Sequence, residues 1–160
     1  MIGILSDTHD NLDRVRAAVR LFNGAGCDLV VHAGDFVAPF TADALRDLAA
    51  PVKAVYGNCD GEKAGLARAF RGLGEIREGP FPFVHGGLRF VVCHLEGAAA
   101  PFFVAKSCDV IVSGHTHFPL VETRGGVLLV NPGEASGWVR GKATAALLDP
   151  VTRTADIVIL

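Results

Sequence analysis

The apolar positions in roughly the first 70 residues alternate between a spacing typical of strands and one typical of helices. Short apolar runs in "MIGILSD", "CDLVVHAGD" and "VKAVYGN" predict three buried strands. Between the first two runs, apolar side chains recur at helical spacing, which predicts a helix with Asp10 or Asn11 as its N-cap. Two shorter helices are predicted at residues 41–49, capped by Thr41, and at residues 62–70. This order favours parallel strands with helices packed on the sheet.

From about residue 75 the pattern changes to hairpins. Two pairs of apolar runs turn at Gly86-Gly87 and at Gly125-Gly126, and glycine pairs are typical of tight hairpin turns. A helix is predicted within "APFFVAKSC", a buried strand within "DVIVSGHTH", and two closing strands within "ATAALLD" and "TADIVIL". Two sheets packed together and flanked by helices would accommodate this order.

Length, composition and charge limit the class of protein. At 160 residues the chain is long enough for one domain, which we expect to span residues 1–160. A net charge of −2 and an isoelectric point near 6.3 argue against stable nucleic-acid binding. The apolar runs are too short to cross a membrane and no leader-like segment opens the chain, so we expect a cytoplasmic protein. The 4 widely spaced cysteines then predict free thiols.

Side chains that can bind metals gather at the ends of the predicted strands. Three early strands end in "SDTH", "HAGD" and "YGNCD", and two later ones end in "VVCH" and "SGHTH". Because ligands of open α/β sheets bind beyond the carboxyl ends of the strands, we expect these groups at one edge. They are Asp7, His9, Asp35, Asn58, His94, His115 and His117. On an extended segment His115 and His117 would point the same way, as two ligands of one ion or as two solvated loop residues.

The number and type of these groups argue for two ions. Seven ligands exceed the four that a single zinc ion takes, but they suit two divalent ions that share a carboxylate. Two such ions bring four positive charges, of which Asp7 and Asp35 neutralise two. A pocket left positive in this way stabilises a phosphate and the added charge of its transition state, with a metal-held hydroxide as the nucleophile.

In this order and with these gaps, the motifs "SDTHDN", "HAGD", "YGNCD", "CH" and "GHTH" resemble those of the calcineurin-like metallophosphoesterases. The resemblance covers nearly the whole chain and is closest to the small bacterial and archaeal phosphodiesterases of that superfamily. It implies an α/β fold, a four-layer α/β/β/α sandwich of two mixed sheets flanked by helices. It also implies phosphoester hydrolysis at a dinuclear centre, with Mn²⁺ as the expected ion and Ni²⁺, Zn²⁺, Fe²⁺ or Mg²⁺ as alternatives.

By position, the resemblance divides the metal ligands into two sets that share Asp35 as a bridge. The first set is Asp7, His9, Asp35 and His117. The second set is Asp35, Asn58, His94 and His115. The resemblance also implies catalytic roles for Asn58, Cys59 and Asp60. In many relatives a histidine paired with that aspartate stands at the place of Cys59 and is thought to protonate the leaving group, for which a thiol is poorer near pH 7.

Several polar and aromatic residues near these motifs are open to interpretation. His32 lies inside an apolar strand, one residue too early to share the site directly, which indicates a buried, hydrogen-bonded histidine. Glu96 and Glu134 stand where relatives commonly carry histidine and serine. If Glu96 lies at the mouth of the cleft, its charge would repel highly anionic substrates. The alternative is that Glu96 is a solvated loop residue without such a role. Trp138 and Phe118 could stack on an organic leaving group or serve packing.

We therefore expect a metal-dependent hydrolase of small phosphodiesters, nucleotide-derived ones among them. Its expected partner is a small phosphoester substrate, with no membrane association, and assembly into a homo-oligomer is left open. A monoesterase or protein phosphatase is one alternative, although the chain is short for the lids that a protein substrate needs. The other alternative is a non-catalytic metal-binding scaffold of the same fold that acts through protein–protein contacts. All seven ligand positions are filled, which favours the enzyme.

Overall fold

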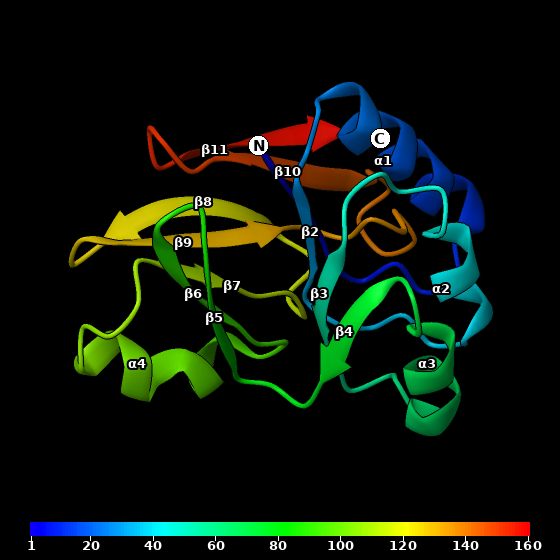
Figure 1. Ribbon diagram of the computed structural model, residues 1–160, viewed down its shortest axis with the longest axis horizontal. Helices are drawn as coiled ribbons and strands as arrows, with labels where there is room; N and C mark the ends of the chain where they lie inside the picture. Colours follow the sequence, from blue (N-terminus) through cyan, green and yellow to red (C-terminus); the bar gives the residue numbers. More distant parts are fainter.

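Two β-sheets lie against each other in the computed structural model, which describes residues 1–160 (Figure 1). The strands of the first sheet are β1 (Ile2–Leu5), β2 (Leu29–His32), β3 (Val52–Val55), β4 (Gly74–Arg77), β10 (Thr144–Asp149) and β11 (Thr154–Ile159). Their order is β11-β10-β1-β2-β3-β4. Strands β1 to β4 run parallel, whereas β10 is antiparallel to both β1 and β11. The predicted parallel strands are thus confirmed.

The second sheet is built from the two hairpins and one strand between them. Its strands are β5 (Phe81–His85), β6 (Leu88–Val92), β7 (Val110–Val112), β8 (Pro119–Arg124) and β9 (Val127–Pro132). Their order is β5-β6-β7-β9-β8, with β6, β7 and β9 parallel. Both hairpins turn at the predicted glycine pairs, and all four glycines have positive φ, which glycine adopts without steric cost.

Helices cover the outer faces of both sheets (Figure 1). On the first sheet these are α1 (Leu12–Gly24), α2 (Phe40–Ala44) and α3 (Lys63–Ala69), which share one apolar core with it. On the second sheet a 3₁₀ turn, η1 (Glu96–Ala99), leads into α4 (Ala100–Val104). A third apolar core fills the space between the sheets. The four-layer α/β/β/α arrangement predicted from the sequence is confirmed.

Burial on both faces explains why the central strands are apolar throughout. Every residue of β1 and β2 is buried, because one face of the sheet packs on helices and the other on the second sheet. Helix α1 buries its predicted apolar stripe, and Asn11 is its cap, since its side chain accepts a hydrogen bond from the Arg14 amide at 3.4 Å. Burial of this stripe holds α1 against the strands that carry the site.

Three local predictions differ from the structure. Helix α2 ends at Ala44, and Thr41 is not its cap, because the Thr41 hydroxyl lies inside the helix and donates a hydrogen bond to Asp10 at 2.6 Å. Strand β4 was not expected, because it is a polar edge strand without an apolar run. The strand expected to reach His117 ends at Val112, so the "GHTH" motif is irregular.

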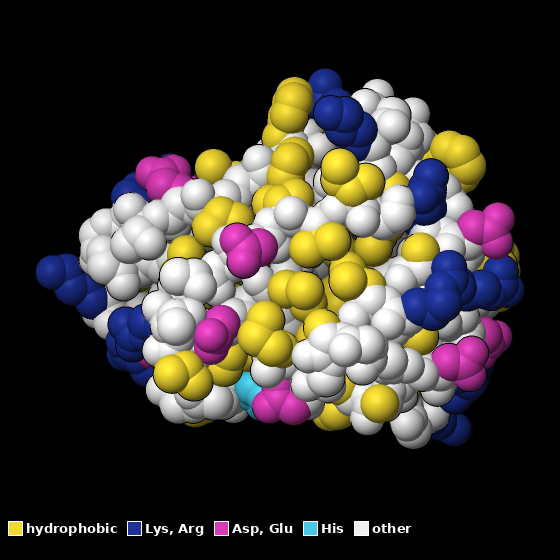
Figure 2. Space-filling view, turned by 90° about the horizontal axis from the view of Figure 1, so that it is seen from above, with side chains coloured by type: hydrophobic (Ala, Val, Ile, Leu, Met, Phe, Trp, Pro, Cys, Tyr) yellow, Lys and Arg dark blue, Asp and Glu magenta, His cyan; other side chains and the backbone are white.

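Two further properties bear on the class of protein. All four cysteines are free thiols, as predicted. Among the helices, even the longest, α1 (Leu12–Gly24), is too short and too polar to cross a membrane. Charged side chains of both signs are interspersed on the face shown in Figure 2, where apolar side chains gather near the middle.

Candidate metal centre

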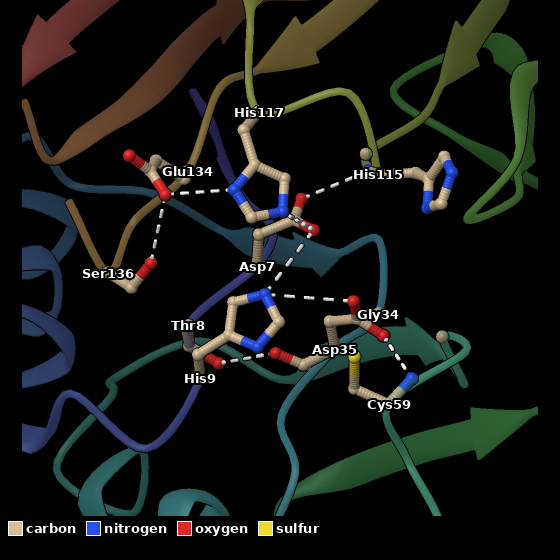
Figure 3. A network of polar contacts seen from close by, with 12 residues as sticks. Asp7, Thr8, His9, Gly34, Asp35, Cys59, His115, His117, Glu134 and Ser136 are labelled. Atoms are coloured by element: carbon tan, nitrogen blue, oxygen red, sulfur yellow. Dashed lines mark hydrogen bonds and ion pairs between the residues drawn. The ribbon is translucent and has the colours of Figure 1, made fainter. Parts of the chain in front are cut away.

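The seven predicted ligands come together at one edge of the molecule, in the loops that follow β1, β2, β3, β6 and β7. Figure 3 shows Asp7, His9, Asp35, His115 and His117. Hydrogen bonds between side chains and backbone join these loops across the two sheets. The His115 amide, after β7, donates to Oδ2 of Asp7, after β1, at 3.1 Å, and Nδ1 of His94, after β6, donates to the Ala33 carbonyl, after β2, at 2.8 Å. The carboxyl ends of strands from both sheets therefore form a single site.

Most of these side chains are presented from a strained backbone. Five of the seven have φ in the left-handed region, which costs a residue other than glycine about 1 kcal/mol or more. They are Asp7 (54°), His9 (38°), Asp35 (62°), His115 (68°) and His117 (61°). Only four other non-glycine residues of the chain share this conformation. Such strain gathers where a function requires a side chain to be aimed.

The first predicted ligand set surrounds the buried carboxylate of Asp7. Its Oδ1 lies 3.3 Å from Nε2 of His117 and 3.8 Å from Nε2 of His9. The same His9 nitrogen lies 3.7 Å from Oδ2 of Asp35. Figure 3 shows His9 between the two aspartates and His117 on the far side of Asp7.

The second predicted set surrounds the side-chain oxygen of Asn58. This Oδ1 lies 2.9 Å from Nε2 of His94 and 2.8 Å from Nδ1 of His115. Nε2 of His94 also lies 3.4 Å from Oδ2 of Asp35. Asp35 thus stands between the two sets, as expected of a bridging ligand.

His115 and His117 point to different sets, contrary to the extended geometry expected from their spacing. Each has positive φ, so the chain turns between them and sends His117 toward Asp7 and His115 toward Asn58. His117 thus lies with Asp7 and His115 with Asn58, and the assignment of either histidine to an ion stays a prediction. Asn131 holds this turn, since its side-chain amide donates to the Gly114 carbonyl at 2.8 Å.

Two of the histidines are held by acceptors on the side away from the site. Nδ1 of His94 donates to the Ala33 carbonyl at 2.8 Å, so Nε2 is the nitrogen that faces the site. Nδ1 of His117 lies 2.8 Å from the carboxylate of Glu134, with the same consequence. Both rings are thereby fixed with Nε2 toward the aspartates.

The residues present fit divalent ions. Asp7 Oδ1 and His9 Nε2 are both buried and have no hydrogen-bond partner, although buried polar atoms are normally paired. Bonds of about 2.0–2.2 Å to one ion place neighbouring ligand atoms about 3–3.5 Å apart, close to the separations around Asp7 and Asp35. Ligand atoms of three overlapping groups lie within 4.8 Å of one another. These groups are Asp7, His9 and His117; His9, Asp35 and Cys59; and Asp7, Asp35 and His94.

The two aspartates have different electrostatic environments. Burial raises the pKa of the Asp7 carboxyl above its usual range. Burial acts in the same direction on Asp35, but hydrogen bonds from His94 and the Cys59 amide outweigh it and lower the pKa of Asp35 to about 2. Cations placed between these carboxylates would favour the anionic form of both.

Cys59 and Asp60 both lie at the site. The family resemblance implies that the side chains at these two positions pair, but here no hydrogen bond joins them. Burial and the nearby charge of Asp35 raise the pKa of the Cys59 thiol to about 11. The carboxylate of Asp60 is buried and accepts hydrogen bonds from the backbone amides of Asp35, Val37 and Gly57 at 2.7–3.0 Å. Asp60 therefore fixes the loops that carry Asp35 and Asn58.

His32 is buried and hydrogen-bonded, as predicted. Its Nδ1 accepts from the Gly34 amide at 3.1 Å, so Nε2 carries the proton and donates to Thr8 at 3.1 Å. The Thr8 hydroxyl in turn donates to the Asp35 carbonyl at 3.3 Å. Burial lowers the pKa of His32 to about 3, so the ring is neutral and ties the loop of Asp7 to that of Asp35.

The two acidic residues that replace residues common in relatives, Glu96 and Glu134, lie in different environments. Glu96 is exposed and lies 3.7 Å from Arg124, which matches the solvated alternative. Glu134 is 1% exposed and contacts His117, a role that its sequence position did not reveal. The signal was an acidic residue two positions after the end of the apolar strand β9, at the edge where the ligands gather.

Comparison with known proteins supports the geometry. A model of the calcineurin-like phosphoesterase superfamily domain matches residues 1–153. The chain belongs to the calcineurin-like phosphoesterase superfamily. This superfamily is metal-dependent, in agreement with the candidate ligands at the strand ends. The resemblance stated from the sequence motifs is confirmed.

This calcineurin-like phosphoesterase has relatives that are named phosphodiesterases. It is 36% identical to phosphodiesterase MJ0936 of Methanocaldococcus jannaschii over an alignment of 152 residues, and this alignment covers 92% of each chain. It is 30% identical over 149 residues to phosphodiesterase YfcE of Escherichia coli, which covers 82% of this chain and 77% of YfcE. A solved structure of a novel archaeal phosphodiesterase superposes with a TM-score of 0.93 at 32% identity, covering 99% of both chains.

Proposed function

We propose that the protein hydrolyses small phosphodiesters at a pair of divalent ions. The proposed ligands of the first ion are Asp7, His9, Asp35 and His117, and those of the second are Asp35, Asn58, His94 and His115. The observation that carries the proposal is the position of Asp35, whose Oδ2 lies 3.7 Å from His9 and 3.4 Å from His94. One carboxylate oxygen thus faces a histidine of each set, and the relatives named phosphodiesterases support the same reaction.

When bound, two divalent ions would supply Lewis acidity, acidify a water molecule and attract the phosphate. The protein holds the ligands for them in place before they bind. Asp60 and His32 fix the loop of Asp35, and the Ala33 carbonyl and Glu134 fix the rings of His94 and His117. Such preorganisation places positive charge where the transition state gains negative charge.

The proposal also assigns roles in the reaction to the three residues that the resemblance marks as catalytic, which are Asn58, Cys59 and Asp60. Asn58 binds the second ion, and Asp60 acts as a positioning residue through the backbone of its loop. Cys59 lies with His9 and Asp35 in one cluster and offers a weakly acidic proton to the leaving group. We therefore propose faster cleavage of diesters with acidic phenol leaving groups than of dialkyl diesters.

The ligand set combines carboxylates, an amide oxygen and imidazoles, which suits Mn²⁺ and leaves Ni²⁺, Zn²⁺, Fe²⁺ and Mg²⁺ as alternatives. A small diester is proposed as the substrate because acidic residues outnumber lysines and arginines, 17 to 15, which gives a net charge of −2. A long nucleic acid requires a continuous basic surface.

The test is hydrolysis of bis-p-nitrophenyl phosphate by metal-stripped protein to which each divalent ion is added back. We expect turnover with Mn²⁺ that Asp35→Asn reduces by at least about a thousandfold, since the substitution removes the charge shared by both sets. The matched control is Asp43→Asn, which changes an exposed aspartate on α2 and leaves turnover intact. Binding of two ions without turnover by any ion would support the scaffold alternative and refute the enzyme.

A further inference from the structure

A second pocket adjoins the candidate metal centre on the side of the first ligand set. Its volume is about 300 Å³ and it opens beside His117, which also contacts Asp7. It is lined by His117, Phe118, Pro119, Arg140, Lys142 and Thr144. A group bound here is therefore next to whatever occupies the metal centre.

Arg140 is held at this pocket by one contact of its guanidinium and one of its backbone amide. Its Cζ lies 3.6 Å from the ring centroid of Phe118, a cation–π contact that fixes the plane of the group. Its backbone amide donates to the buried carboxylate of Glu134, which also contacts His117. The loop that carries Arg140 is closed by a hydrogen bond of 3.1 Å between the Gly141 amide and the Gly137 carbonyl. Arg140 and His117 are thus anchored on the same carboxylate.

The two cations of this pocket form no ion pair within the protein. Arg140 and Lys142 are exposed, and neither takes part in any of the ion pairs of the structure. Eight of the 15 arginines and lysines form ion pairs, for example Lys53 with Glu75 at 2.6 Å. Two unpaired cations around one hollow form a site that attracts an anion.

The opposite side of the metal centre has no such charge. A hollow of about 210 Å³ lies there beside His94 and Asn58, and no lysine or arginine lines it. Its one charged group other than a histidine is Glu78, which lies 2.8 Å from Lys63. The centre is therefore flanked by a cationic pocket on one side and a neutral to acidic hollow on the other.

We infer that the pocket formed by Arg140 and Lys142 binds a second anionic group of the substrate, so that the preferred diester carries a phosphate-like group on one arm and a neutral group on the other. The inference rests on the proposed function and names its substrate class. Arginine binds a phosphate through two parallel hydrogen bonds, and lysine adds a point charge, so both would contribute to recognition. The Phe118 ring covers one face of the guanidinium, whose N–H groups form no hydrogen bond or ion pair within the protein.

The test compares two chromogenic diesters with the same p-nitrophenol leaving group, one with a propyl and one with a 3-phosphonopropyl arm. With Mn²⁺ bound, we expect kcat/KM to be about tenfold or more higher for the phosphonopropyl diester. Arg140→Gln and Lys142→Gln should each reduce this ratio several-fold. Arg20→Gln, which removes an exposed, unpaired arginine from α1, should leave the ratio as it is.

The ratio of kcat/KM between the two diesters tests the anionic pocket, whereas turnover itself tests the proposed function. Turnover of both diesters at a ratio near one would overturn the anionic pocket and leave the phosphodiesterase in place. An equal fall of the ratio in Arg20→Gln would also overturn it, because the preference would then come from overall charge. No turnover of either diester with two ions bound would overturn the proposed function, and the inference with it.

Discussion

Glu134 offers a specific test of how the candidate site is held. Its carboxylate is 1% exposed, lies 2.8 Å from Nδ1 of His117 and accepts from the amides of Val139 and Arg140. Glu134→Gln keeps the size of the side chain but replaces one acceptor oxygen by an NH₂ donor. N–H donors already face both carboxylate oxygens of Glu134. Whichever way the glutamine side chain is turned, its NH₂ group therefore faces one of these donors and cannot accept its hydrogen bond.

The mismatched hydrogen bond should lower the stability of the protein and change which nitrogen of His117 carries the proton. A buried hydrogen bond that is broken on one side costs about 1–3 kcal/mol, so the metal-free protein should lose stability by that amount. If the new NH₂ group faces His117, the imidazole proton moves to Nε2, the atom that faces Asp7 at 3.3 Å. That nitrogen then has no lone pair for an ion. Loss of such a supporting contact lowers metal affinity by about 10–100-fold.

Calorimetric titration of metal-stripped protein with Mn²⁺ measures this effect directly. We expect Glu134→Gln to weaken one of the two binding events and leave the other nearly unchanged, because His94 is held by the Ala33 carbonyl instead. Glu122→Gln is the matched control, since Glu122 lies on strand β8 and pairs with Arg124 at the surface. A folded Glu134→Gln protein with unaltered affinity for both ions would refute the reasoning.

Three further predictions concern packing beside the site, packing of helix α1 and an ion pair at the other end of the second sheet. Gly57→Ala should weaken Mn²⁺ binding by about tenfold or more in the same titration, because a Cβ there overlaps the Asp35 carboxylate; unchanged binding would contradict this. Phe22→Ala should lower the free energy of unfolding by about 3–5 kcal/mol in guanidinium chloride, because its buried ring joins α1 to the sheet; a loss under about 1 kcal/mol would refute it. Arg89 holds the pKa of Asp109 below its usual value, so this pair stabilises the protein above about pH 4 and the effect is lost as the pH falls further. Asp109→Asn should therefore cost about 1 kcal/mol near pH 7 and much less near pH 2, whereas a pH-independent cost would exclude the ion pair as the cause.

The sequence predicted the layers and the edge of the site because both depend on local patterns. Strands buried on two faces must be apolar throughout, and helices need one apolar stripe, so the alternation in the first half was readable. The polar residues that follow each apolar run were then expected at one edge. The structure places Asp7, Asp35 and Asn58 there, from three adjacent parallel strands.

What the sequence did not show depends on backbone conformation and on partners distant along the chain. The directions of His115 and His117 follow from two positive φ angles, which residue type alone does not indicate. Glu134 contacts His117 across 17 residues, and its amide partners come from the loop that follows it. Strand β4 pairs with β3 through its backbone and needs no apolar run, so its sequence carries no strand pattern.

The central claim is that one carboxylate, that of Asp35, joins two ions in a single centre. Electron paramagnetic resonance of metal-stripped protein titrated with Mn²⁺ tests this most directly, because two ions that share a ligand are magnetically coupled. We predict two bound ions per chain with a coupled spectrum in the wild type, and loss of the coupling in Asp35→Asn. A single bound ion, or two ions with uncoupled spectra in the wild type, would contradict the account.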